Sequence, residues 1–171
     1  MDQSNAYTTV KHTLTVQASI FEALGKSAEK RGIEINQLIV DLIVEATIRD
    51  GTLDDQTKAR YRLGRSLVDR VVETAVRLCE EGKFSESITL DAIRTRTADP
   101  EWATDYRTFI ENDIYKHGNP LKIINREFGS RIRAAINGLV KKDALGKVLN
   151  VKVVGEIIQS YTPMAKYDLK S

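Results

Sequence analysis

The hydrophobic and polar positions alternate near the start of the chain. An extended backbone over residues 10–16 would place four side chains on one face, namely Val10, His12, Leu14 and Val16. The opposite face would carry Lys11, Thr13 and Thr15. This period of two, with β-branched residues, predicts a half-buried strand. A lone strand is unstable and no second strand with a hairpin turn follows, so we expect it to pair with the same strand of another subunit.

Two short helices are predicted directly after this strand. The first opens at Ser19, and Glu22 three residues later completes a capping box, while Gly32 supplies the C-cap. Its apolar stripe consists of Ile20, Leu24 and Ala28. The second begins near Asn36, ends before Asp50, and has a broad apolar face of Leu38, Ile39, Leu42, Ile43 and Ala46. One strand and two short helices cannot close a core alone, so we expect this segment to dimerise.

The order of these features resembles the ribbon–helix–helix family of DNA-binding proteins, of the Arc, MetJ and CopG type. The resemblance covers residues 8–50 and comprises a strand, a capped helix, a glycine turn and a second helix. It implies that two strands pair antiparallel across a dimer axis and enter the major groove of DNA. The outward side chains of that ribbon would then read base edges, and here they are Lys11, Thr13 and Thr15.

The chemistry of these side chains suits the implied role. A lysine can donate to guanine O6 and N7, and a threonine offers both a hydroxyl and a methyl group that can meet the methyl group of thymine. The resemblance also implies a phosphate clamp in the turn before the second helix, over residues 32–36, which include Glu34 and Asn36. Backbone N–H groups would hold the phosphate there, helped by the helix dipole.

A polar break at residues 51–55 predicts a boundary between two domains, 1–52 and 56–171. Beyond it, a long helix is predicted through the stripe Leu63, Leu67, Val71, Ala75 and Leu78, ending near Glu81. Thr89 is predicted to cap a short helix, and Pro100 to begin the next one. The sequence of residues 88–94 resembles that of the second helix of bacterial helix-turn-helix proteins. The helix that follows it is acidic, however, and phosphate would repel it, which favours a purely structural bundle.

The last third of the chain is basic. Residues 116–152 contain nine Lys and Arg against two acids, Glu127 and Asp143. Residues 122–142 are predicted to form one helix, with Arg126, Arg131 and Arg133 away from its apolar stripe. A basic turn and a strand over residues 148–154 follow, which suggests a winged-helix-like ending with Lys141, Lys142 and Lys147 on the wing. Two interpretations stay open for these residues: a second DNA contact, or the basic surface of a partner-binding domain.

Composition narrows the class of protein. The 171 residues are 42% hydrophobic and 29% charged, with a net charge of +2, as expected for a globular protein. We expect no membrane span, because no apolar stretch approaches the ~20 residues that one requires. The first residues have neither a basic region nor an apolar run, so we expect no secretory signal. The single cysteine, Cys79, fits a reducing compartment, and we therefore expect a cytoplasmic protein.

Catalytic and metal-binding chemistry are not indicated. The two histidines, His12 and His117, are not at ligand spacing from Cys79 or from each other. Phosphate-binding loops, dinucleotide motifs and nucleophile elbows are missing from the sequence. We therefore expect a protein that is not an enzyme and that requires no cofactor and no metal.

The sequence thus predicts a mainly α protein with short β elements, in which a dimeric ribbon–helix–helix precedes a helical, winged-helix-like domain. Its expected function is that of a sequence-specific binder of double-stranded DNA, a repressor or autoregulator of a bacterial, plasmid or phage operon. An alternative is an antitoxin or a relaxosome or partition accessory protein, whose C-terminal domain binds a protein partner. A further alternative is a protein-interaction domain that does not bind DNA.

Overall fold

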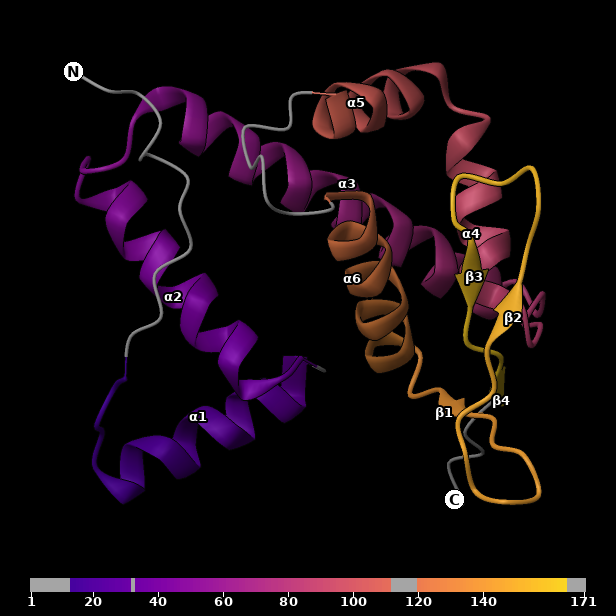
Figure 1. The fold of residues 1–171 in the computed structure, drawn as a ribbon, viewed down its shortest axis with the longest axis horizontal. Coiled ribbons are helices and arrows are strands. Elements are labelled where there is room, and N and C mark those ends of the chain that lie inside the picture. Colours follow the sequence, from indigo (N-terminus) through magenta and orange to yellow (C-terminus); the bar gives the residue numbers. More distant parts are fainter. Residues whose placement is uncertain (1–12, 32, 112–119, 166–171) are drawn as a thin grey trace.

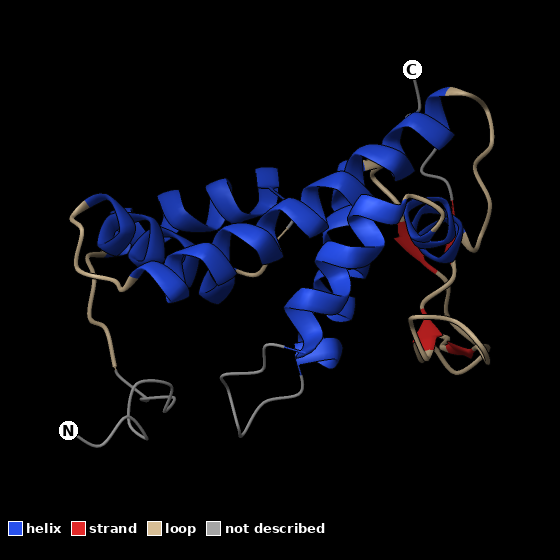
Figure 2. Ribbon diagram, turned by 90° about the horizontal axis from the view of Figure 1, so that it is seen from above, coloured by secondary structure: helices blue, strands red, loops and turns tan. Residues whose placement is uncertain are grey.

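The chain is mainly helical with short strands, as the sequence predicts (Figure 2). The computed structural model describes residues 13–31, 33–111 and 120–165. Within these ranges the helices are α1 (Ala18–Arg31), α2 (Ile35–Arg49), α3 (Asp55–Glu80), α4 (Ile88–Thr97), α5 (Pro100–Glu111) and α6 (Pro120–Ala135). The strands are β1 (Leu139–Val140), β2 (Val151–Lys152), β3 (Ser160–Tyr161) and β4 (Met164–Ala165).

Helices α1 and α2 form a hairpin at one end of the molecule (Figure 1). The turn between them is closed by a hydrogen bond from the Ile33 N–H to the Ala28 carbonyl, 3.0 Å long. The second helix begins and ends within a residue of its predicted bounds. Ala28 and Leu38 are the apolar side chains that the hairpin buries, and most of its other apolar positions remain at least partly exposed. The hairpin by itself therefore has very little core.

The described part of the predicted N-terminal strand, residues 13–16, does not form a strand within the single chain. Residues 13–17 have no regular secondary structure, and residues 10–12 lie outside the described residues, as does Gly32. A strand requires a hydrogen-bonded neighbour, and the four described strands pair only with one another. The predicted capping box is wrong, because α1 starts at Ala18 and Ser19 lies inside its first turn. The carbonyl of Gln17 accepts the first helical N–H groups, from Ile20 and Phe21, at 3.0 Å each.

Helix α3 is the long helix around which α4, α5 and α6 pack (Figure 1). Asp54 caps it, since its carboxylate accepts a hydrogen bond of 2.9 Å from the Thr57 N–H. The predicted apolar stripe is confirmed in its central part, where Leu67, Val71 and Ala75 have no exposed surface. The helix ends at Glu80, as predicted, and Gly82 then takes a positive φ of 73° that reverses the chain.

Residues from α3 to β4, called the larger domain below, share one core, which is built on α3 and centred on aromatic rings. Trp102 of α5 is fully buried and stacks on Tyr106, with ring centroids 5.1 Å apart. Phe128 of α6 lies 6.2 Å from Trp102, and the Trp102 indole N–H donates to the Leu67 carbonyl at 3.4 Å. The apolar residues that surround these rings come from every other part of this domain, and they include Ile88, Ile93, Ile132, Ile158 and Met164.

The turn between α4 and α5 is fixed by a carboxylate. Pro100 begins α5, as predicted, and Asp99 accepts hydrogen bonds from the Glu101 and Trp102 N–H groups at 3.1 and 3.4 Å. The predicted cap at Thr89 is wrong, because α4 starts one residue earlier and Thr89 is buried inside it. Its hydroxyl meets no hydrogen-bond partner among the described residues.

Helix α6 is shorter than the predicted helix over residues 122–142. It ends at Ala135, after which Asn137 takes a φ of 50° and Gly138 donates its N–H to the Arg133 carbonyl at 2.8 Å. A Cβ atom on Gly138 would lie 3.1 Å from the sulfur of Met164, so glycine lets the chain pass close to β4. The left-handed turn directs the chain out of the helix and into β1.

The strands form two small antiparallel ladders. β1 pairs with β4, with Leu139 opposite Ala165, and β2 pairs with β3, with Val151 opposite Tyr161. The predicted strand over residues 148–154 is reduced to β2 and a single bridge between Lys142 and Val148. The winged-helix-like ending is not supported, because β1 pairs with the last strand rather than with the strand that follows it.

Candidate nucleic-acid interface

The described ribbon residues lie just before the start of α1. Thr13 and Thr15 are exposed, and Lys11 lies outside the described residues. Leu14, predicted to face a core, is 59% exposed within the single chain, and Val16 is half-buried. The segment therefore exposes both polar and apolar side chains.

Exposed apolar side chains are also found on both helices of the hairpin. On α1 it includes Ile20 and Phe21, about half exposed at 49% and 51%. On α2 it includes Val40, Leu42 and Ile43. Together with Leu14 these residues define the hairpin apolar surface. Soluble proteins rarely leave neighbouring apolar side chains of this size in water, and such surfaces mark interaction sites.

The predicted phosphate clamp falls at the start of α2. Glu34 is the N-cap residue with extended backbone angles, and its side chain makes no capping hydrogen bond. The first turn of α2 contains no acidic residue, and Asn36 in that turn is exposed. The first N–H groups of an α-helix have no partner inside the helix, and they lie at its positive end. Both predicted clamp residues are thus accessible beside a helix N-terminus.

The three arginines predicted on α6 have different surroundings. Arg126 and Arg133 are exposed. Arg131 instead extends to α2, where its Nη2 atom lies 3.2 Å from the Asp41 carboxylate. Its side chain is only 18% exposed. Arg131 is therefore held by an internal ion pair, and the structure gives it a different neighbour from the DNA phosphate that the sequence suggested.

Asp41 is the centre of a polar cluster that sequence reasoning missed. It is only 3% exposed, although it lies on the apolar side of α2. Besides Arg131, its carboxylate accepts hydrogen bonds from Gln37 Nε2 at 2.9 Å and from the Tyr61 hydroxyl at 3.0 Å. A second ion pair lies nearby, between Arg65 of α3 and Glu45 of α2, at 2.7 Å. These contacts connect the α1–α2 hairpin to α3 and α6.

The electrostatics of this cluster follow from burial and from its charges. Burial and, next in size, the hydrogen bond to Asp41 together raise the pKa of the Tyr61 hydroxyl to about 12. Burial also raises the pKa of Glu127, against the opposing effect of the Arg131 charge. Tyr61 thus remains a neutral hydrogen-bond donor, and Arg131 compensates the buried carboxylate. Both features indicate that the cluster has a structural role, joining α2 to α3 and α6; it is called the structural joint below.

The remaining predicted residues lie on the connection between β1 and β2. Lys142 and Lys147 are exposed, while Lys141 forms an ion pair of 2.5 Å with Glu86. In Figure 1 this connection and residues 13–17 stand at opposite ends of the long axis of the molecule. The structure therefore does not bring the two predicted basic sites together within one chain.

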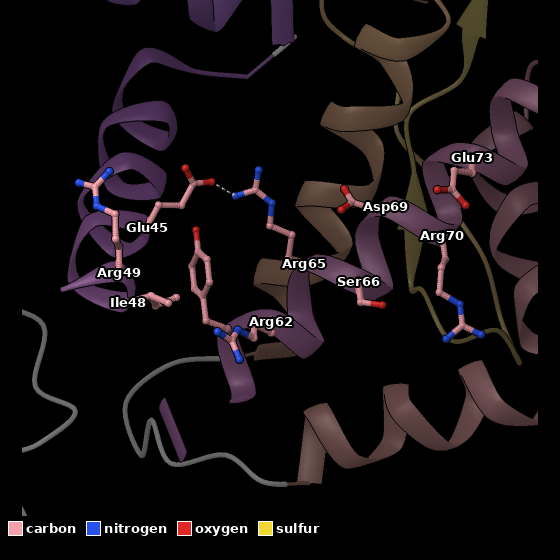
Figure 3. A pocket seen from close by; sticks show the side chains of 10 residues that line it. Glu45, Ile48, Arg49, Arg62, Arg65, Ser66, Asp69, Arg70 and Glu73 are labelled. Carbon is pink, nitrogen blue, oxygen red and sulfur yellow. Dashed lines mark hydrogen bonds and ion pairs between the residues drawn. The ribbon is translucent and has the colours of Figure 1, made fainter. Parts of the chain in front are cut away.

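An open hollow between α2 and α3 is lined by side chains of both charges (Figure 3). Its lining includes Arg49, Arg62, Arg65 and Arg70 together with Glu45, Asp69 and Glu73. The Arg65–Glu45 pair crosses it, and Arg70 binds Asp99 and Asp105 at 3.0 and 3.2 Å. Side chains of both charges line the hollow, and several of them are already paired with each other or with nearby residues. The hollow therefore has no clear preference for an anion or a cation.

Three further tests bear on the type of site. The described residues contain no group of three or more His, Cys, Asp or Glu that could hold a metal ion. None of the described helices combines the length and the apolar character needed to cross a membrane. Comparison of the chain with protein-family models, with curated proteins and with solved structures gave no match.

Proposed function

We propose that this chain forms a homodimer that binds double-stranded DNA sequence-specifically through residues 10–16, as a repressor or autoregulator of a bacterial, plasmid or phage operon. The observation that carries the proposal is the hairpin apolar surface. A hairpin that buries Ala28 and Leu38 but exposes Leu14, Phe21 and Ile43 has half of a core. A second copy would supply the other half.

Pairing of two chains explains the segment before α1 as well. Residues 13–17 have no strand partner among the described residues. An antiparallel ladder between two copies would bury Leu14 and satisfy the backbone groups of both strands. Thr13 and Thr15 would then lie together on the opposite face of the ribbon, with Lys11 in the same row. A two-stranded ribbon fits into the major groove, where each base pair shows a distinct pattern of donors and acceptors.

The start of α2 supports the same orientation. Its first N–H groups and the exposed Asn36 can contact a phosphate beside the ribbon. The Asp41 cluster holds the larger domain against this hairpin, so that domain keeps a fixed position relative to the bound DNA. Its exposed Arg126 and Arg133 add positive charge at that position.

The test is duplex binding across a salt series, with the wild type beside the variant K11A/T13A/T15A. A control variant removes the same residue types elsewhere on the surface, K83A/T95A/T104A, because these three side chains are exposed. Affinity of the wild type should fall with salt by a slope near one per phosphate contact. The ribbon variant should bind at least about tenfold more weakly on a selected operator, since base contacts are worth ~1–3 kcal/mol each.

Light scattering on the same samples gives the oligomeric state. The proposal is supported if the wild type is a dimer that binds DNA and the ribbon variant is a dimer that binds DNA more weakly. Equal binding by the ribbon variant and the wild type would assign DNA to another surface, and a monomer without DNA affinity would overturn the proposal altogether. Selection of a preferred sequence from random duplexes then separates a sequence-specific repressor from a nonspecific DNA-binding protein.

A further inference from the structure

The connection between β1 and β2 is a structured hairpin over residues 141–149, referred to below as the basic hairpin. Backbone hydrogen bonds join its two sides, from the Leu149 N–H to the Lys141 carbonyl at 2.9 Å and from the Asp143 N–H to the Lys147 carbonyl at 2.8 Å. At the tip, one carboxylate oxygen of Asp143 accepts from the N–H groups of Leu145 and Lys147, both at 2.9 Å. Gly146 takes a φ of 78°, which a side chain would strain.

The hydrogen-bonded tip carries an apolar side chain that is almost fully exposed. Leu145 is 93% exposed, at a position where turns usually carry glycine, asparagine or another polar residue. The loop is fixed by Asp143 and Gly146, so nothing in its own geometry requires a leucine between them. Leu145 is therefore free to contact another molecule, and its charged neighbours indicate which kind of molecule would suit it.

The charge of the surrounding segment identifies that molecule as anionic. Residues 139–155 contain four lysines, of which Lys141 is paired with Glu86, and a single acid, Asp143, whose carboxylate is occupied by the backbone of the tip. Lys142 and Lys147 flank Leu145 and are exposed. In Figure 1 the connection between β1 and β2 extends beyond the helices, so the tip can reach a surface. An apolar side chain between two lysines is complementary to a nucleic-acid groove that has phosphates along both edges.

We propose that the basic hairpin enters the minor groove of the bound duplex and inserts Leu145 between two base pairs, which bends the DNA. This inference rests on the proposed function and adds a second, architectural activity to it. Apolar side chains that enter the minor groove partly unstack a base step and kink the duplex, and the bend brings more DNA into contact with the protein. Lys142 and Lys147 would lie against the two phosphate backbones that border the groove.

Bending is measured on the full-length chain with a duplex of about 30 base pairs that carries a donor and an acceptor dye at its two ends. The variants are L145A, which removes the wedge, and D143A, which loosens the tip. The control is V154A, because Val154 is 97% exposed, lies near the strands and carries no flanking lysine pair. In Figure 1 the connection between β2 and β3, residues 153–159, extends away from the basic hairpin.

The wild type and V154A should raise the transfer efficiency on binding. With L145A the rise should fall by about half or more, and D143A should give an intermediate value. Binding should persist in both variants, weakened by up to about tenfold, because the ribbon contacts remain. A wild type that binds without bending, or an L145A variant that bends the duplex fully, overturns this inference and leaves the proposed function intact.

Two further outcomes would also count against it. If the wild type binds no duplex, the proposed function and this inference fail together. If Leu145 is instead required for sedimentation with vesicles of phosphatidylserine and phosphatidylcholine, and not for bending, then the hairpin serves an anionic lipid surface. Base-step insertion is supported only when bending is lost in L145A, retained in V154A, and independent of such vesicles.

Discussion

Asp41 and Arg131 are 90 positions apart in the chain and form an ion pair of 3.2 Å between α2 and α6. The carboxylate is 4% exposed and the guanidinium 18%, so the pair is largely removed from water. Gln37 and Tyr61 complete the hydrogen bonding of Asp41. Buried charges are tolerated only when they are paired and hydrogen-bonded, and each member of this group therefore depends on the others.

Replacement of Arg131 by methionine should destabilise the fold strongly. It would leave Asp41 buried with neutral donors alone, and it would remove the charge that lowers the pKa of the neighbouring Glu127. Loss of one partner of a buried pair costs about 3–5 kcal/mol, and the partial exposure of Arg131 places the expected loss near the lower value. Urea unfolding followed by circular dichroism measures this difference.

Two comparisons separate the pair from a general effect of charge removal. R133A removes an exposed arginine from the same helix and should change the free energy of unfolding by less than about 0.5 kcal/mol. The double variant D41L/R131M removes both charges and should recover most of the loss. If R131M and R133A are equally stable, Asp41 does not depend on Arg131.

Alkaline pH should weaken the same joint through Tyr61. Its pKa is about 12 in the folded chain against an ordinary value of 10, because burial and the hydrogen bond to Asp41 favour the neutral form. Below pH 10 the hydroxyl is protonated in both states and its contribution is complete. Between pH 10 and about 12 the unfolded chain loses the proton while the folded chain keeps it, so stability falls as pH rises.

The measurement is the free energy of unfolding in urea across that range, for the wild type and Y61F. The variant loses one hydrogen bond at every pH, but its stability should fall less steeply above pH 10. Burial also raises the pKa of Tyr106 to about 12, so part of the slope should persist in Y61F and decrease further in Y61F/Y106F. A slope that is unchanged in the double variant would contradict the assignment to these two hydroxyls.

A charge on the hairpin apolar surface should abolish the proposed dimer. Ile43 is 55% exposed on α2, so I43D costs little in the single chain but places a carboxylate in the dimer core. We expect a monomer by sedimentation equilibrium, with the helices of the larger domain intact and DNA affinity lost. V154D carries the same new charge on an apolar residue outside this surface and should remain a dimer. If wild type and I43D have the same monomer–dimer equilibrium at every concentration, the dimer contact lies elsewhere.

Local patterns were sufficient to predict the helices of the larger domain. The stripe along α3 has helical spacing, and Pro100 can occupy the start of a helix and little else, so both elements follow from neighbouring residues. The end of α6 was harder to predict, because apolar spacing continues through Ile136 and Leu139. The turn depends on a left-handed Asn137 and on the approach of Gly138 to Met164, which is 26 residues away.

The Asp41 cluster shows where sequence reasoning ended. A single acid in the run Leu38 to Val44 was a visible exception to the apolar face of α2, and it was the available signal. Its partners lie 20 residues away, in Tyr61, and 90 residues away, in Arg131. Periodicity predicts which side of a helix is buried. It does not predict which distant side chain will pair with a polar residue on that side. The sequence pattern therefore places Arg131 with its exposed neighbours on α6.

Gly64 in α3 should be intolerant of a single added methyl group. A Cβ atom there would lie 2.7 Å from Cε2 of Phe109, whose ring is also held by Arg60, 4.4 Å above it, with an Arg60 hydrogen bond to the Phe109 carbonyl. Glycine to alanine inside a helix ordinarily stabilises by about 0.5–1 kcal/mol. At Gly64 the overlap should reverse the sign, with a loss of about 1–3 kcal/mol in urea unfolding.

Gly129 in α6 provides the matched control for this last change. An added Cβ there meets no atom within 4 Å, so G129A should stabilise the chain by about 0.5–1 kcal/mol. The double variant G64A/F109A tests the cause, because removal of the ring leaves nothing for the new methyl group to overlap. On the F109A background, G64A should therefore become neutral or stabilising. If G64A remains equally destabilising without the ring, its effect arises from the backbone of α3 and not from the contact with α5.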